Sequence, residues 1–288
     1  MKKKVLALIM AGTMALSMAA CGNTQSQDTP KEPEKQETVQ TEGTEAGGAT
    51  DISGITADSF KPSKDFNVRV PFAAGGSADT IARIIGQGLQ ETYGKSVIVN
   101  NLTGANGAIA AADLDSAKSD ATELMVGGIA MFTLAPLFNK DINLNIDDYQ
   151  FVSGLVLEDL ILYVNPSNSG IEDWDGLVEY AADNRIVFGS NAPGGATHLL
   201  ATMLFGEAGL DAEAVTSDGS GKDLLAVASG KVVCAVAPAS VGAQYVEDGS
   251  LVPIAVFSEE NYTGYEGYDV PTVQSWDMIS YSIHVILS

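Results

Sequence analysis

The chain from about residue 59 onward alternates between short strand-like patterns and longer helical patterns. Segment 66–72 alternates apolar and polar residues and predicts a strand, whereas segment 78–92 spaces its isoleucines as one face of a helix does. By the same criteria, further strands are predicted at 96–100, 123–127, 151–157, 160–164, 186–189, 214–216, 232–236, 252–257 and 280–288, and further helices at 107–117, 171–184, 197–208, 222–229 and 241–248. This order predicts an α/β fold with one or two mainly parallel sheets flanked by helices.

The first 20 residues have the pattern of an export signal. Three lysines at positions 2–4 precede a short apolar run at 5–15, and small residues then lead to Cys21. A small-residue run that ends in cysteine resembles the lipobox of bacterial lipoproteins, in which the cysteine is lipidated. We therefore expect a lipoprotein signal peptide at 1–20 and a lipid on Cys21. The alternative is an ordinary signal peptide with an incidental cysteine.

A polar spacer follows the signal. Residues 22–50 contain one valine and no other large apolar residue, so burial cannot offset the entropy lost on ordering. We expect residues 21–58 to form a disordered acidic linker between a lipid-anchored cysteine and the globular part.

Charge and cysteine content narrow the range of functions. The chain has 37 acidic against 15 basic residues and a formal net charge of −22, which disfavours nucleic acid and anionic lipid as partners. The second cysteine, Cys234, lies in an apolar run that predicts a buried strand. With two histidines and one such thiol, we expect no disulfide, no metal site, no cofactor and little acid–base chemistry.

Two segments share a strand, a glycine-rich loop and a helix: residues 70–80 (VPFAAGGSADT) and 188–198 (FGSNAPGGATH). Glycines let the backbone approach a ligand, and the following helix presents unbonded N–H groups and a positive dipole end. Such loops can bind a carboxylate without basic side chains. Taken singly, each could instead be a tight turn that only closes a strand-to-helix connection.

The first loop and three other stretches resemble the substrate-binding receptors of tripartite tricarboxylate transporters, the Bug-type proteins. The stretches are 70–83, 97–107, 190–199 and 270–273 with Asp269 in front. The resemblance implies a periplasmic-binding-protein fold of two α/β lobes that close over a ligand. On this chain, lobe 1 would comprise residues 60–161 plus 252–288, and lobe 2 residues 162–251.

The resemblance also implies the ligand-binding residues. On lobe 1 these would be Phe72, Ala73, Gly75, Gly76, Ser77, Asp79, Gly104 and Asn106. On lobe 2 they would be Ser190, Asn191, Gly194, Gly195, Thr197, His198, Gly219 and Ser220. Asp79 could accept a hydrogen bond from the ligand or only complement its helix. His198 could be no more than a partly buried histidine at a helix start.

Three departures from the family pattern bear on the ligand. The run 128–132 is apolar, Ala237 and Pro238 stand where an aspartate is common, and Ser217 and Asp218 replace an aromatic residue or lysine. They suggest an acid with an apolar portion. The family usually continues beyond a strand like 280–288 into terminal helices, so we also expect a shortened form with an exposed apolar patch on lobe 1.

The resulting hypothesis is an exported, lipid-anchored, monomeric receptor that captures a small carboxylate and delivers it to a membrane permease. The alternatives are a carboxylate-sensing receptor domain and a carboxylate-processing enzyme on the same scaffold.

Overall fold

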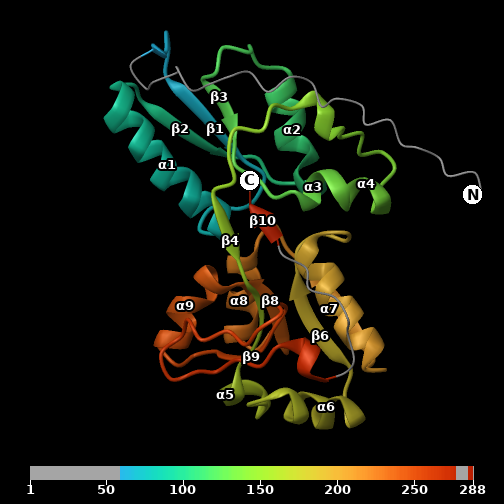
Figure 1. The fold of residues 1–288 in the computed structure, drawn as a ribbon. Helices are drawn as coiled ribbons and strands as arrows, with labels where there is room; N and C mark the ends of the chain where they lie inside the picture. Colours follow the sequence, from blue (N-terminus) through green and yellow to red (C-terminus); the bar gives the residue numbers. More distant parts are fainter. Residues whose placement is uncertain (1–58, 277–284, 288) are drawn as a thin grey trace, which may run out of the picture. The chain divides into compact units, whose positions relative to one another are not determined.

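The computed structural model describes residues 59–276 and 285–287, all within one unit that spans residues 54–288 (Figure 1). The expected signal peptide, Cys21 and the linker therefore lie outside the described residues. Of the strand expected at 280–288, only 285–287 are described, and they form strand β10 (Val285–Leu287).

The first sheet is wholly parallel and has the order β2-β1-β3. Its strands are β1 (Phe66–Val70), β2 (Val97–Asn101) and β3 (Glu123–Met125). On one face, Val68 and Val70 of β1 pack with Ala78 and Ala82 of helix α1 (Ser77–Tyr93). On the other face, Arg69 bonds to helix α2 (Ala108–Asp115). Side chains alternate along a strand, so the two helices cover opposite faces.

Short elements that the sequence analysis did not predict lie between β2 and α2 and after β3. These are the 3₁₀ turn η1 (Ala105–Gly107) before α2, helices α3 (Ala130–Thr133) and α4 (Ala135–Phe138), and the 3₁₀ turn η2 (Ile146–Asp148). A four-residue helix is too short to show a helical period in the sequence. The strand expected over 151–157 is confined to β4 (Val156–Glu158), which pairs antiparallel with β10.

The second sheet has the order β7-β6-β8-β5-β9. Its strands are β5 (Leu160–Val164), β6 (Ile186–Ser190), β7 (Ala212–Thr216), β8 (Cys234–Pro238) and β9 (Val252–Val256). Strand β6 is parallel to β7 and β8, whereas β5 is antiparallel to β8 and β9. Strand β9, which the sequence analysis placed with lobe 1, thus hydrogen-bonds to β5 in the second sheet.

Both faces of the second sheet are covered by helices and carry the main hydrophobic core. The elements around it are α5 (Pro166–Ser169), α6 (Trp174–Asp183), α7 (Ala196–Glu207), α8 (Ser220–Ala228), α9 (Ala239–Glu247) and the 3₁₀ turn η3 (Val273–Trp276). Leu160 and Leu162 of β5 pack in the cluster that holds α6 and α7, and Tyr163 in the one that holds α8 and α9. This two-sided burial explains the continuous apolar run of β5.

The fold places Cys234 where the sequence predicted it, in a buried strand. Its burial strongly raises the pKa of the thiol. No helix among residues 59–276 combines the length and apolar character needed to cross a membrane.

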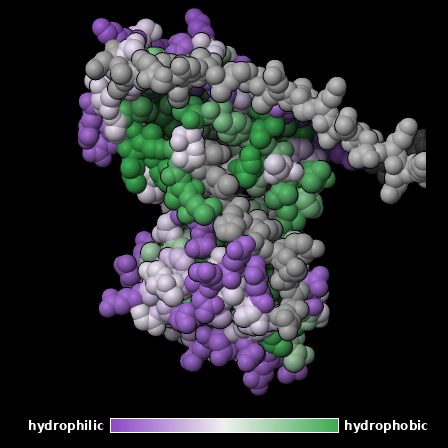
Figure 2. All heavy atoms as spheres, in the orientation of Figure 1, coloured by the Kyte–Doolittle hydropathy of each residue, from purple (hydrophilic) through white to green (hydrophobic). Residues whose placement is uncertain are grey.

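Exposed large apolar side chains gather around the first sheet. On the face shown in Figure 2, apolar residues cover much of the surface there, whereas hydrophilic residues cover most of the surface around the second sheet. Around the first sheet and on the chain that follows it, the exposed apolar residues are Ile84, Ile98, Ile109, Leu137, Phe138, Ile146, Phe151, Val152, Leu155 and Leu157.

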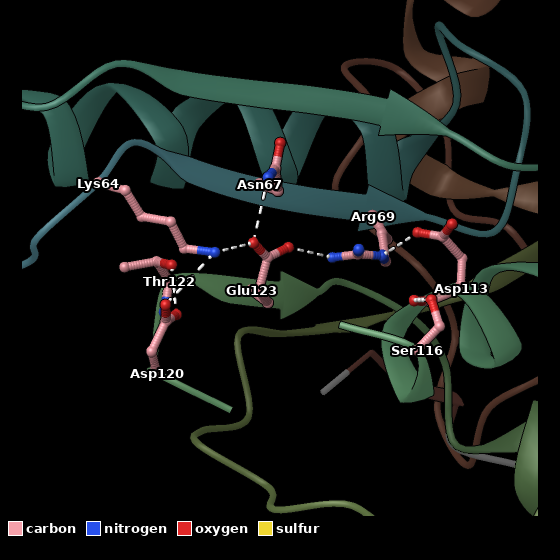
Figure 3. A network of polar contacts seen from close by, with 8 residues as sticks. All are labelled: Lys64, Asn67, Arg69, Asp113, Ser116, Asp120, Thr122 and Glu123. Carbon is pink, nitrogen blue, oxygen red and sulfur yellow. Dashed lines mark hydrogen bonds and ion pairs between the residues drawn. The ribbon is translucent and has the colours of Figure 1, made fainter. Parts of the chain in front are cut away.

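A buried ion-pair network joins β1 to β3 and α2 (Figure 3). Arg69 is only 7% exposed, and its guanidinium donates to Asp113 at 2.5 Å and to Glu123 at 2.8 Å. Lys64 donates to the other oxygen of Glu123 at 2.6 Å. The hydrogen bond from Lys64 lowers the pKa of Glu123, burial opposes this, and Arg69 adds to it, so the pKa falls from 4.5 to about 2.

We expect Glu123→Gln to destabilise the protein by roughly 1.5–3 kcal/mol at neutral pH, because Arg69 and Lys64 lose a charged partner in a buried site. The pKa is lower in the folded state, so this stabilisation is present above about pH 4.5 and disappears as the pH falls toward about 2. Thermal or urea unfolding of both proteins across this range measures the difference.

Glu213→Gln is the matched control, because Glu213 pairs with Arg185 while both side chains are more than half exposed. It should change stability by less than about 1 kcal/mol. Equal effects of the two substitutions, or a Glu123→Gln effect that persists below pH 2, would contradict the assigned role of the network.

Candidate ligand-binding site

A cavity of about 100 Å³ lies at the ends of β1, β6 and β8, where loops from both sheets meet. Its lining combines backbone-rich loop residues with apolar side chains. The lining residues are Phe72, Gly76, Ser77, Ala78, Asn106, Gly128, Ala130, Met131, Leu160, Asn191, Gly194, Gly195, Ala196, Thr197, Gly219, Ser220 and Pro238. None of these residues carries a charged side chain.

Three helices begin at this cavity. The N-cap residues of α1, α7 and α8 are Gly76, Gly195 and Gly219, and none of them provides a side-chain cap. All three glycines line the cavity, as do the first residues of the three helices. The first N–H groups of an α-helix have no acceptor within the helix, and the helix dipole makes this end positive. The cavity can therefore accept an anion without a basic side chain.

The two glycine pairs predicted from the sequence form the same turn. Gly75 and Gly194 have φ angles of +83° and +84°, in the left-handed region that favours glycine. The second glycine of each pair, Gly76 or Gly195, is extended and serves as the N-cap. The first glycine therefore makes the turn and the second brings bare backbone to the cavity wall.

Hydrogen bonds hold the loops around the cavity together. The Ala73 N–H donates to the carbonyl of Asp218 at 3.1 Å, and the side chain of Asn106 donates to the carbonyl of Pro193 at 2.7 Å. The hydroxyl of Ser77 donates to the carboxylate of Glu158. The Ala73 amide is thus already bonded to protein, so the amides that can face a ligand on this loop belong to the following residues.

Asp79 is engaged within the protein and does not line the cavity. Its carboxylate accepts the Gly75 N–H at 3.0 Å, the guanidinium of Arg83 and the amide of Asn101. Burial opposes its ionisation, but these donors outweigh burial and lower the pKa of Asp79. Of the two roles left open for Asp79, the structure supports holding the loop and the start of α1.

Most of the residues that the resemblance implied reach the cavity. Those that line it are Phe72, Gly76, Ser77, Asn106, Asn191, Gly194, Gly195, Thr197, Gly219 and Ser220, and those that do not are Ala73, Gly75, Asp79, Gly104, Ser190 and His198. Burial lowers the pKa of His198, whose ring lies 6.4 Å from that of Phe188.

The set of candidate residues omitted much of the apolar wall. The omitted lining residues are Ala78, Gly128, Ala130, Met131, Leu160, Ala196 and Pro238. Segment 128–132 and Pro238 depart from the family pattern. This departure is the sequence signal that could have identified them as lining residues. Leu160 gave no signal, because it reads as an ordinary buried strand residue.

Three buried polar atoms have no hydrogen-bond partner among residues 59–276: Asn191 Oδ1, His198 Nδ1 and Asp223 Oδ2. The Asn191 side chain belongs to a residue that lines the cavity, so its carboxamide can bind a ligand atom there. Asp223 is 1% exposed, and burial raises its pKa to about 6 although Ser217 opposes this.

This chain is similar in sequence to several curated bacterial proteins. BugT of Bordetella pertussis is 27% identical over 223 residues, which cover 76% of this chain and 67% of BugT. A protein of Agrobacterium vitis is 29% identical over 177 residues, which cover 61% of this chain and 51% of that protein. The chain thus spans about half to two thirds of the length of the curated relatives it matches.

Solved structures share the fold. A periplasmic transporter structure is 27% identical with a TM-score of 0.72, over 78% of this chain and 75% of that one. An R. palustris protein solved with adipate is 23% identical with a TM-score of 0.71, over 79% and 76%. MatC from Rhodopseudomonas palustris, solved with bound malate, is 23% identical with a TM-score of 0.68, over 78% and 76%.

These structures confirm the α/β periplasmic-binding-protein architecture expected from the sequence. The sequence profile described as "Tripartite tricarboxylate transporter family receptor" matches residues 81–285, which is most of the globular part. The chain therefore belongs to the tripartite tricarboxylate transporter receptor family.

Proposed function

We propose that the protein is an extracytoplasmic receptor that captures a small organic acid for a tripartite tricarboxylate-type membrane transporter. The observation that carries the proposal is the meeting of three glycine-capped helix N-termini at one cavity without charged lining residues. A carboxylate would accept hydrogen bonds from the first-turn N–H groups, and its carbon chain would lie on the apolar wall.

Local electrostatics make this binding compatible with a net charge of −22. Each helix start acts as roughly half a positive charge, and the effect falls off within the first turn, so it is felt mainly inside the cavity. Charges spread over the surface are screened by salt within about 10 Å. Family membership supports the ligand class, since the family's receptors serve tricarboxylate-type transporters.

Receptors of this family bind substrates and are not enzymes, which excludes the enzyme alternative. A sensory role would use the same cavity with a signalling partner in place of a permease. We favour the permease because the family's receptors belong to transporters.

We also propose that the protein is exported and anchored to the membrane by a lipid on Cys21. Removal of residues 1–20 would leave Cys21 as a lipidated first residue, and residues 22–58 would give the receptor reach from the membrane. We also propose that the protein acts as a monomer whose two lobes close over the ligand. Lobe 1 would comprise residues 60–161 plus 252–288, and lobe 2 residues 162–251. In that division, β9 would belong to lobe 1 although it pairs within the second sheet.

Calorimetry with mono-, di- and tricarboxylates is expected to find at least one acid that binds and is recovered chemically unchanged. An uncharged amide of the same acid is the control, and it should bind much more weakly because the helix ends favour an anion. If no acid binds, or if the amide binds equally well, the proposal fails.

Gly76→Ala should weaken binding of that acid by about tenfold while leaving the melting temperature nearly unchanged. Gly76 has φ −86° and ψ 174°, which alanine adopts readily, and an added Cβ would meet only the Ala73 carbonyl, at 3.5 Å. The methyl group would nevertheless take up space in the cavity. Calorimetry and thermal unfolding separate the two effects.

Gly88→Ala is the matched control in the same helix, because Gly88 does not line the cavity and an added Cβ meets nothing within 4 Å. It should preserve affinity and raise stability by up to about 1 kcal/mol through helix propensity. Unchanged affinity in Gly76→Ala would show that ligand binds elsewhere.

Cys21→Ser should release the protein from the membrane fraction of a bacterial host that processes lipoproteins, because the serine cannot carry the thioether-linked lipid. Cys234→Ser is the control, and the molecules of this variant that fold should remain in the membrane fraction. A wild-type protein found in the soluble fraction would favour an ordinary signal peptide.

A further inference from the structure

The start of α1 already faces acidic side chains of the chain itself. Ser77, the first residue of α1, lines the cavity and is 9% exposed, and its hydroxyl donates to the carboxylate of Glu158 on β4. Asp79, in the same turn, forms a salt bridge with Arg83 at 2.9 Å. Within residues 59–276, Glu158 forms no salt bridge.

The start of α7 offers the better place for a ligand carboxylate, because its first turn contains no acidic residue, whereas the first turns of α1 and α8 contain Asp79 and Asp223. Ala196 begins α7 and lines the cavity together with Asn191, whose carboxamide NH₂ group can donate to a carboxylate. The exposed charges beside α8, Asp218 and Lys222, pair with each other at 2.7 Å. The buried Asp223 in the first turn of α8 forms no salt bridge among residues 59–276, so α7 is the helix whose first-turn N–H groups face the cavity without an acidic residue in the same turn.

Between the two ends, the wall suits a hydrocarbon chain. Phe72, Met131, Leu160 and Pro238 line the cavity, and no lining residue is a lysine, arginine or histidine. A second carboxylate at the far end of a ligand would have to give up water without meeting a cation. It would also come close to Glu158, which accepts the hydrogen bond of Ser77 at this end of the cavity. The two carboxylates would then repel each other.

Within the receptor role proposed above, we infer that the site selects acids with one carboxylate and an apolar chain, and that Glu158 is the residue that rejects a second carboxylate. The ligand carboxylate lies at the start of α7, and its chain extends along the apolar wall toward Ser77. Glu158 determines specificity by its charge, acting beside Ser77 at the α1 end.

Matched pairs of acids test this inference on the wild-type protein. Hexanoate and adipate have equal length and differ only in a terminal methyl group or carboxylate, and butanoate and succinate form a shorter pair. We expect calorimetry to give the mono-acid of the better-binding pair a dissociation constant roughly tenfold below that of its diacid, a difference of about 1.4 kcal/mol.

Glu158→Gln tests the assigned residue. Glutamine keeps the size of the side chain and an acceptor for the Ser77 hydroxyl but removes the charge, so the tenfold preference should shrink, mainly through tighter diacid binding. Glu172→Gln, at an exposed glutamate away from the cavity, should keep the wild-type preference. Thermal unfolding verifies that both variants are folded, and the wild-type comparison remains decisive if Glu158→Gln does not fold.

The outcomes separate this inference from the proposed function. Diacids or citrate binding as tightly as or more tightly than matched mono-acids would overturn the inference and leave a carboxylate receptor in place. An unchanged preference in folded Glu158→Gln would overturn the role of Glu158. If no acid of any kind binds, the proposed function fails, and this inference with it.

Discussion

The unbonded N–H groups at the starts of α1, α7 and α8 are the constraint on which the site depends. A helix cannot satisfy these donors itself, and an N-cap serine, threonine, asparagine or aspartate usually supplies an acceptor. Here the N-cap is glycine in all three helices, so the donors stay available to the cavity. The glycine pairs, the strand ends that position them and the hydrogen bonds between loops all serve to bring these donors to one place.

This arrangement also explains how the chain uses its few cations. Arg69 and Lys64 are committed to Glu123 beneath the first sheet, Arg83 to Asp79, and Lys222 to Asp218. These pairs hold the frame of the cavity without entering its lining. Because backbone dipoles are fixed by the helices, they recognise an anion without the side-chain ordering that a lysine would require. An acidic protein can in this way keep an anion-binding cavity.

The sequence predicted the parts of this structure that local patterns determine. The strand–loop–helix units at 70–80 and 188–198 were recognisable because glycine pairs and helical periodicity are local signals. The sheet to which β9 belongs and the short helices α3 and α4 were not, since the first depends on long-range pairing and the second are shorter than a helical period. Within the first loop, the amides of Ala73 and Gly75 were expected to face a ligand. The structure shows them bonded to Asp218 and Asp79, partners that only the folded chain brings close.

The glycine-capped helix starts and the apolar side chains that line the cavity determine different properties of the ligand. The glycine-capped helix starts are backbone features, so they specify that an anion is bound and say little about the rest of the ligand. Met131 of α3 and Pro238 at the end of β8 contribute side chains, which can change without disturbing the helix starts. Ligand identity in such a protein therefore resides in wall residues and in neighbours such as Glu158. Similarity concentrated in the glycine loops identifies the class of receptor but leaves its acid to be determined from the wall.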